Sequence, residues 1–318
     1  MVWGENGHGV QRHADRPVPF PAPVPPKSVR SEVPARRGLL RNKATATREA
    51  LSVAARRVFA IRPTYAHREG TPVTATSEQT AEPRFRGDMT VELVKHSAAD
   101  TDVLWAARVS TSGEQSLDEL QKDPERSKGL INFLMRDRHG SPFEHNSMTF
   151  FVSAPLFVFR EFHRHRVGWS YNEESGRYRR LEPVFYLPEP SRKLVQQGRP
   201  GKYEFVEGTP EQHELTVQAM EESYRQAYGT YQRLLDAGVA REVARAVLPV
   251  GLYSSMYATC NARSLMHFLG LRTQHEQAQV PSFPQREIEM VGERMEAQWA
   301  ELMPLTHAAF NANGRVAP

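Results

Sequence analysis

Prolines divide this chain of 318 residues into two parts that cannot fold in the same way. Ten of the 23 prolines fall in residues 1–88, where residues 17–26 read P-V-P-F-P-A-P-V-P-P. Proline lacks the backbone N–H and fixes φ, so this run favours polyproline II and cannot form a helix or the interior of a sheet. We therefore predict a disordered N-terminal extension over residues 1–88 and a folded domain over residues 89–318.

Charge follows the same division. Residues 1–88 hold 15 Lys/Arg against 8 Asp/Glu, whereas residues 89–318 hold 26 against 29. The basic character that would suggest nucleic-acid binding therefore belongs to the extension alone. A targeting presequence and a nucleic-acid-binding arm remain alternatives to plain disorder there, and Met89 is a second candidate for the natural start of translation.

Composition excludes several classes of protein. A single cysteine, Cys260, rules out an intramolecular disulfide framework and any Cys-rich zinc or iron–sulfur site. No apolar run reaches the roughly 18 residues of a membrane span, and the N-terminus lacks the pattern of a cleavable signal. We expect a soluble protein of a reducing compartment, the cytoplasm, with no membrane partner.

From residue 89 onward, hydrophobic periodicity indicates regular elements. We expect strands at residues 89–96, 147–153 and 156–162. Helices are expected at residues 98–108, 117–138, 211–237, 241–248, 261–271 and 286–302. Strands clustered early and helices clustered late indicate an α+β fold rather than an alternating βαβ fold.

The densest segment for chemistry is residues 159–180, F-R-E-F-H-R-H-R-V-G-W-S-Y-N-E-E-S-G-R-Y-R-R. Six arginines and two histidines alternate there with five aromatic residues. Planar guanidinium groups suit phosphate recognition, and small residues let backbone N–H groups approach an anion. A solvated basic face is the plain alternative, but the interleaved aromatic residues favour a planar, phosphorylated ligand such as a nucleotide or a flavin.

Other chemistries find less support. His163 and His165 lie two residues apart and, with His139 and His145, form an alternative metal site. No zinc-binding spacing supports it and the flanking arginines oppose a cation, so we predict no metal. The chain has no dinucleotide-binding glycine motif, no P-loop and no nucleophile elbow. We expect Cys260 to pack in the core.

Four residues in the C-terminal third are again arginines and a histidine, the residue types that are concentrated in residues 159–180. Arg245 lies in R-E-V-A-R-A-V-L-P, and Arg272 ends the expected helix at 261–271. On that helix Arg263 and His267 are four residues apart and share a face. Each alone is compatible with a surface salt bridge, whereas together they suggest a ligand site.

These segments resemble one known family. R-H-R at residues 164–166, followed by S-Y-N-E-E-S-G-R-Y at 170–178, resembles the signature of flavin-dependent thymidylate synthases. H-G-S-P-F-E-H at 139–145 is similar to the family's flavin-side loop. R-E-V-A-R-A-V-L-P at 241–249 and N-A-R-S-L-M at 261–266 are similar to its C-terminal helices. The resemblance runs from about residue 89 to about residue 305, and residues 1–88 match nothing in the family.

The resemblance implies an α+β fold with a central, mainly antiparallel sheet flanked by long helices. It implies reductive methylation of dUMP to dTMP, with 5,10-methylenetetrahydrofolate as carbon donor, FAD as hydride carrier and NADPH as reductant. No cysteine nucleophile and no nucleic-acid partner are expected. The active sites of the family lie between the subunits of a homotetramer, so we expect the same assembly.

Site residues follow from the matched motifs. The positions that match FAD contacts are His139, Ser141, Arg164, His165, Arg166, Glu173, Asn261, Arg263 and His267. The positions that match dUMP contacts are Glu161, Arg164, Glu173, Glu174, Ser175, Gly176, Arg177, Arg245 and Arg272. Arg272 also matches the catalytic residue that promotes ionisation of uracil, because a permanently charged guanidinium stabilises the imide anion. Two positions depart from the pattern, since Glu161 stands where relatives often have Gln and His267 where some have Asn.

Two rival functions stay open. One is a basic nucleic-acid-binding module that uses residues 1–88 and 159–180, which would be colourless and salt-sensitive. The other is a flavoprotein of this fold that lacks synthase activity.

Overall fold

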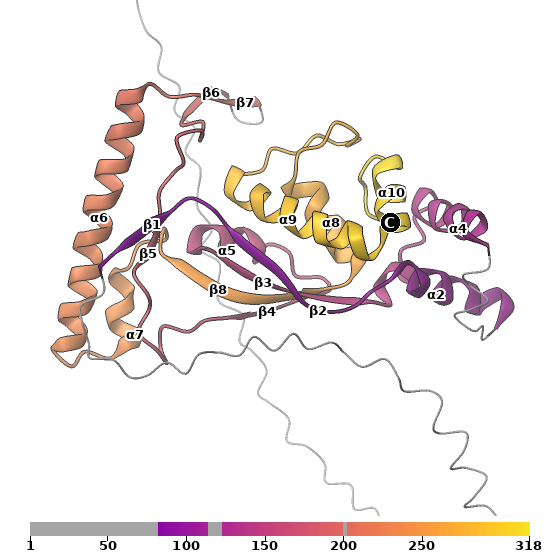
Figure 1. Cartoon of the computed structure of the whole chain (residues 1–318), viewed down its shortest axis with the longest axis horizontal. Coiled ribbons are helices and arrows are strands. Elements are labelled where there is room, and N and C mark those ends of the chain that lie inside the picture. The colour runs from indigo at the N-terminus through magenta and orange to yellow at the C-terminus, as the bar shows by residue number, and fades with distance from the viewer. Residues whose placement is uncertain (1–81, 114–122, 200–201) are drawn as a thin grey trace, which may run out of the picture. The chain divides into compact units, whose positions relative to one another are not determined.

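The computed structural model describes residues 82–113, 123–199 and 202–318, all of which belong to one unit, Thr64–Pro318 (Figure 1). The prediction of a disordered extension falls almost wholly on residues 1–81, outside the described residues, as does the first part of the helix expected at 117–138. Among the described helices, none is long and apolar enough to span a membrane.

A four-stranded sheet lies at the centre, with strand order β2-β3-β8-β4 and antiparallel pairing throughout. The strands are β2 (Thr90–Ser97), β3 (Ser147–Pro155), β8 (Tyr253–Cys260) and β4 (Trp169–Glu173). Side chains along β3 alternate between the two faces of the sheet. Met148, Phe150 and Val152 are fully buried on one face, and the residues between them are half-buried on the other. The predicted α+β class with a central antiparallel sheet is confirmed.

Helices pack on one face of this sheet. α5 (Leu156–Phe162), α8 (Ala262–Arg272) and α9 (Arg286–Leu302) lie together above it in Figure 1. Their apolar sides meet the strands in one core that includes Phe150, Phe162, Phe268 and Met295. α2 (Asp100–Ser112), α4 (Pro124–Arg136), the 3-10 turn η1 (Ser141–Glu144) and α10 (Pro304–Ala312) extend this core at one end.

The opposite face of the sheet carries exposed side chains at its centre. Phe151 of β3 pairs in register with Tyr257 of β8, and their rings meet with centroids 5.9 Å apart. Tyr257 is 52% exposed, and Asn172, its register partner in β4, is exposed as well. An aromatic pair in this position is unusual for a face that meets only water.

A second, smaller core forms around α6 (Pro210–Asp236). Three tyrosines on α6 pack against Phe185 of β5 (Val184–Tyr186) and against Leu252. β5 pairs in parallel with β1 (Arg84–Arg86), so an ordered strand precedes the expected domain start at Met89. α7 (Arg241–Ala244), η2 (Arg245–Val247) and the hairpin of β6 (Val195–Arg199) and β7 (Lys202–Val206) complete the described elements.

Most expected elements are present, but two expectations fail. Residues 156–162 form helix α5 and not a strand, because the chain leaves β3 at the N-cap residue Pro155 and a helix places Val158, Phe159 and Phe162 on one buried side. The expected helix at 241–248 splits into α7 and η2. Helix α10 and the strands other than β2 and β3 were not anticipated.

Candidate active site

Arg272 is held by two partners at the end of α8. Its Nε donates to Nε2 of His165 over 3.1 Å, and its Nη1 forms an ion pair with the Glu161 carboxylate. Glu161 comes from α5 and His165 from the turn that follows it, so the start of the arginine-rich segment and the end of α8 meet here. We call Glu161, His165 and Arg272 the Arg272 cluster.

The electrostatics of this cluster follow from its burial. Burial, together with the charges of Arg272 and His267, lowers the pKa of His165 to about 4. His165 is therefore neutral at physiological pH, with its proton on Nδ1, because Nε2 must accept from Arg272. The arginine thus meets one neutral acceptor and one carboxylate.

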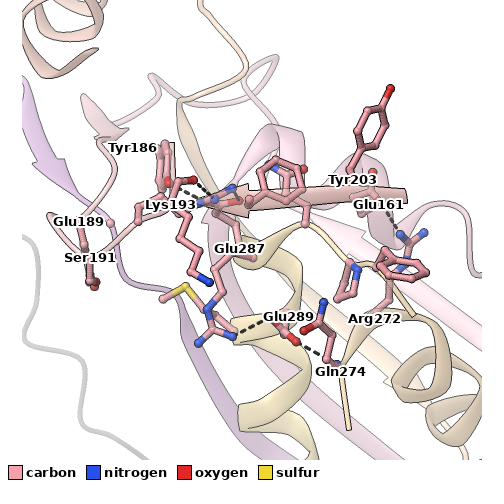
Figure 2. Close-up of a pocket in the computed structure, with 18 of the residues that line it drawn as sticks. Glu161, Tyr186, Glu189, Ser191, Lys193, Tyr203, Arg272, Gln274, Glu287 and Glu289 are labelled. Atoms are coloured by element: carbon pink, nitrogen blue, oxygen red, sulfur yellow. Dashed lines mark hydrogen bonds and ion pairs between the residues drawn. The ribbon is translucent and has the colours of Figure 1, made fainter. Parts of the chain in front are cut away.

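A cavity of about 1020 Å³ opens beside Arg272 (Figure 2). Arg272 and Glu161 line one end, while Lys193 and Glu287 lie toward the other. Glu287 is buried and accepts from Tyr186 Oη over 2.6 Å and from Arg192 Nε over 2.7 Å. The cavity is large enough for a ligand of nucleotide size.

A second group of predicted residues gathers after β4. The Ser175 cluster comprises residues 174–177 with Arg245 of η2. Gly176 is buried, and a Cβ on it would lie 3.1 Å from Cδ of Arg245 and 2.8 Å from Leu181, so only glycine permits this close approach. Arg177 pairs with Glu242 over 2.9 Å, whereas Arg245 is exposed and has no ion pair with any described residue.

Two serines of the neighbouring strand β8 orient the acidic residues at the end of β4 by hydrogen bonds. Glu173 accepts from Ser254 Oγ over 2.9 Å, and Glu174 accepts from Ser255 Oγ over 3.2 Å. Glu174 also pairs with Arg179 over 3.1 Å. These bonds orient the two carboxylates without neutralising Arg245.

A third group lies at the start of α8. The Arg263 cluster comprises Ser141, Asn261, Arg263 and His267. Arg263 pairs with Glu144 over 2.5 Å and donates to the Pro318 oxygen over 2.6 Å. Asn261 caps the helix by accepting from the Ser264 N–H, which leaves its amide NH₂ available. Burial and then the charge of Arg263 lower the pKa of His267.

The remaining predicted residues differ in surroundings. Arg164 and Arg166 are exposed, and the described part of the chain gives neither guanidinium an ion pair. His139 is exposed, with its ring against Phe133 at 5.6 Å between centroids. The two arginines are thus free for an anion, whereas His139 has a neighbour within the chain.

One chain does not bring the three clusters together. Trp169 pairs with Cys260 and Glu173 pairs with Met256, so the Arg263 and Ser175 clusters lie at opposite ends of the β4–β8 ladder, about 13 Å apart along the strands. Arg272 ends α8 while Arg263 lies in its first turn, which separates them by about 14 Å along the axis. Each cluster alone is too small to surround a cofactor and a substrate.

Two alternative chemistries considered from the sequence were a cysteine nucleophile and a metal site. The thiol of Cys260 is buried in the core, and burial raises its pKa, so it is not a nucleophile at neutral pH. Among the described residues, no three His, Cys, Asp or Glu side chains are grouped to hold a metal ion. His165, the central candidate for the metal site, instead accepts from Arg272.

This chain is similar to known proteins over most of its described length. Residues 92–305 match the family model described as "Thymidylate synthase complementing protein". A flavin-dependent thymidylate synthase from Streptomyces avermitilis is 82% identical over 246 residues, covering 77% of this chain and 100% of the relative. The corresponding protein from Streptomyces coelicolor is 86% identical over 234 residues, covering 74% and 95%.

The chain belongs to the flavin-dependent thymidylate synthase family. The resemblance inferred from the motifs is confirmed, and so is the assignment as an enzyme. Among solved structures, the UMP/dUMP methylase PolB from Streptomyces cacaoi bound with 5-Br dUMP has a TM-score of 0.69 and 56% identity, covering 74% of this chain and 99% of that chain.

Three acidic residues of the candidate site were missed by the sequence analysis. Glu144 and Glu242 lie within the matched segments 139–145 and 241–249 but were given no role, and the acidic residue Glu287 of the cavity lies outside the matched segments. Glu242 lies 65 residues from Arg177, and Glu144 lies 119 residues from Arg263. Only the tertiary fold brings such pairs together, so no spacing rule finds them.

Proposed function

We propose that this enzyme converts dUMP to dTMP by reductive methylation. 5,10-Methylenetetrahydrofolate donates the carbon and becomes tetrahydrofolate, and NADPH supplies the reducing hydride through FAD and becomes NADP⁺. The match along the whole S. avermitilis relative carries the proposal, and the setting of Arg272 gives it a chemical basis. We place the reaction in the cytoplasm.

Arg272 is the residue to which we assign catalysis. Its guanidinium faces a cavity of nucleotide size and keeps donors beyond those used by His165 and Glu161. A fixed cation beside the uracil imide stabilises the anion, which makes C5 nucleophilic enough to attack the methylene donor. Because the Cys260 thiol is buried and protonated, the ring must be activated without a cysteine adduct.

The Ser175 cluster suits the nucleotide phosphate. Arg245 offers an unpaired charge beside the bare backbone of Gly176, which is a favourable setting for an anion. Ser175 supplies a hydroxyl and Arg177 a second cation, shared with Glu242. We assign Glu173 and Glu174, which β8 orients, to polar contacts with the nucleoside.

The donor set fits FAD. Arg164 and Arg166 are exposed cations without described counter-ions, as a diphosphate group requires. Arg263, His267, the free amide of Asn261 and the nearby Ser141 provide neutral and cationic donors for the flavin. When bound, FAD supplies the hydride, and the chain supplies position and charge.

The separation of the clusters supports a homotetramer. The Ser175 and Arg263 clusters lie at opposite ends of the β4–β8 ladder, so a complete site needs residues of other copies. The exposed face of the sheet, with Phe151 and Tyr257 at its centre, offers a surface for such a copy. Size-exclusion chromatography with light scattering measures the assembly, and a monomer with full activity would contradict this part of the proposal.

The test uses the full chain. We expect a yellow protein whose flavin absorbance responds to dUMP and which forms dTMP only when methylenetetrahydrofolate and NADPH are both present. A colourless protein with salt-dependent DNA affinity would instead support the nucleic-acid-binding alternative. A flavoprotein without dTMP formation would support the inactive alternative. UMP belongs in the same assay because the structural relative is a UMP/dUMP methylase, and we expect dUMP to be preferred.

A further inference from the structure

The hydrogen bonds of Arg272 divide its guanidinium into a held part and a free part. A guanidinium has five N–H donors. One of them, at Nε, is used by His165 and another, at Nη1, by Glu161. No described residue bonds to Nη2, and the side chain lines the cavity beside Glu161 (Figure 2). The free donors are therefore the ones that can reach a ligand.

His165 lies behind Arg272 and outside the cavity wall. It is 9% exposed, and it is not among the residues that line the cavity. Its ring packs edge-on against Phe268 with centroids 4.9 Å apart, and its backbone oxygen accepts from Tyr171 Oη over 2.8 Å. In the described chain the ring can therefore influence a ligand in this cavity only through Arg272.

The two partners of Arg272 differ in charge. The imidazole of His165 is neutral because burial keeps its pKa near 4, so it orients the guanidinium and leaves the positive charge intact. The carboxylate of Glu161 also orients the guanidinium but offsets its charge. Removing these two partners should therefore change the effect of Arg272 in opposite directions.

We propose that His165 is a positioning residue that aims the Arg272 guanidinium at the bound uracil, while Glu161 limits the positive potential that the uracil experiences. This inference rests on the proposed function, because it takes Arg272 as the group that stabilises the uracil anion. It assigns the His165 side chain to Arg272, whereas its motif matches a flavin contact.

The test measures the imide pKa of a bound nucleotide. The probe is 5-fluoro-dUMP, whose fluorine reports ionisation by ¹⁹F NMR, added to the full-length flavin-loaded enzyme without folate or NADPH. The variants are His165→Phe, which keeps an aromatic ring but removes the acceptor, His165→Gln, which restores an acceptor, and Glu161→Gln. The control is His163→Phe, because exposed His163 lies two residues away with its ring against Tyr171 and makes no bond to Arg272.

We expect the wild-type enzyme to lower the imide pKa below that of the free probe. In His165→Phe the imide pKa should rise toward that of the free probe by about half a unit or more. The same variant should lower kcat about tenfold with a smaller change in KM. His165→Gln should recover most of both. Glu161→Gln should lower the imide pKa further. The control should match the wild type, and bound flavin and melting temperature show that each variant is folded.

The outcomes separate the inference from the proposed function. A wild-type enzyme that binds the probe without lowering its imide pKa contradicts the role of Arg272 itself. A wild-type shift that His165→Phe leaves unchanged overturns only the positioning role. Equal damage from Phe and Gln also overturns it, since ring shape and not the acceptor would then matter. If His165→Phe does not fold, His165→Leu removes the same acceptor and is judged by the same criteria.

Discussion

The arginines of this site fall into two regions that differ in exposure and in whether the described chain supplies a partner for the charge. Arg272 is 18% exposed and already bound on two sides by His165 and Glu161. Arg164 and Arg166, which flank His165 in sequence, are exposed and have no ion pair among the described residues. Arg272, which contacts the central residue of the R-H-R motif, and the two arginines of that motif thus have opposite environments.

This difference separates two tasks. A cation that must stabilise charge developing on a substrate acts best when it is already fixed, since no reorganisation is then needed during the reaction. A cation that binds a soluble anion needs unpaired donors, because an existing carboxylate partner would compete with the anion. Arg272 meets the first requirement, and Arg164 and Arg166 meet the second.

The largest expected effect follows from removing Arg272. Arg272→Ala should lower the single-turnover rate at saturating dUMP by about 100- to 1000-fold, by analogy with loss of an oxyanion donor. Arg272→Lys should fall between this variant and the wild type, because it keeps the charge but loses the planar group. FAD content should be similar in all three, since Arg164, Arg166 and Arg263 remain. A near wild-type rate in Arg272→Ala would contradict the catalytic assignment and show that Arg272 only binds the nucleotide.

A third environment is that of Arg315, which is buried and bonded only within the described chain. It forms a two-point ion pair with Glu296 at 2.6 and 2.7 Å and donates to Thr273, the residue after Arg272. Arg315→Met should cost about 3 kcal/mol of unfolding free energy, because the half-buried Glu296 carboxylate loses its charged partner and keeps only the bond with His307. The exposed arginine Arg225 is the control, and Arg225→Met should cost less than about 1 kcal/mol. Equal losses in chemical denaturation would contradict this distinction.

The same pair predicts the acid sensitivity of the fold. Burial raises the pKa of Glu296, but hydrogen bonds from Arg315 and His307 outweigh burial and lower the pKa to about 2. Because the folded-state pKa lies below the unfolded one, this stability is present above about pH 4.5 and is lost as the pH falls toward 2. Glu296→Gln should be less stable at pH 7 and should lose less stability between pH 5 and pH 3.

Local pattern predicted the fold where elements are long and periodic. The bounds of α9 match the expected helix at residues 286–302, and β3 begins as predicted. The prediction for residues 156–162 was wrong because aromatic and β-branched residues suit strands, whereas packing of Val158, Phe159 and Phe162 in the core favours a helix here. The motifs identified candidate residues, but not the bond of Arg272 to His165, which lies 107 residues away. Such partners depend on packing and not on local sequence.

Removing the exposed arginines should have a moderate effect, confined to flavin affinity. Arg164→Ala and Arg166→Ala should each weaken FAD binding about 10- to 100-fold, the range for loss of a charge-assisted hydrogen bond. The wild-type affinity should fall with added salt. Arg160→Ala removes an exposed arginine of α5 that is not assigned to the site, so it should bind FAD like the wild type. A loss in Arg160→Ala equal to the other two would show that general surface charge, and not the motif, holds the cofactor.

The smallest effect on turnover is expected from shortening the chain. A protein that starts at Glu82 keeps every described residue, whereas one that starts at Met89 loses β1, whose Arg86 oxygen accepts from the Leu187 N–H over 3.0 Å. All assigned site residues follow Met89, so both proteins should retain FAD and full turnover at 25 °C. The protein that starts at Met89 should melt at a lower temperature, because β5 and Tyr253 lose their contacts with residues 84–88. Loss of flavin from a folded protein that starts at Glu82 would instead show that the N-terminal extension takes part in the site.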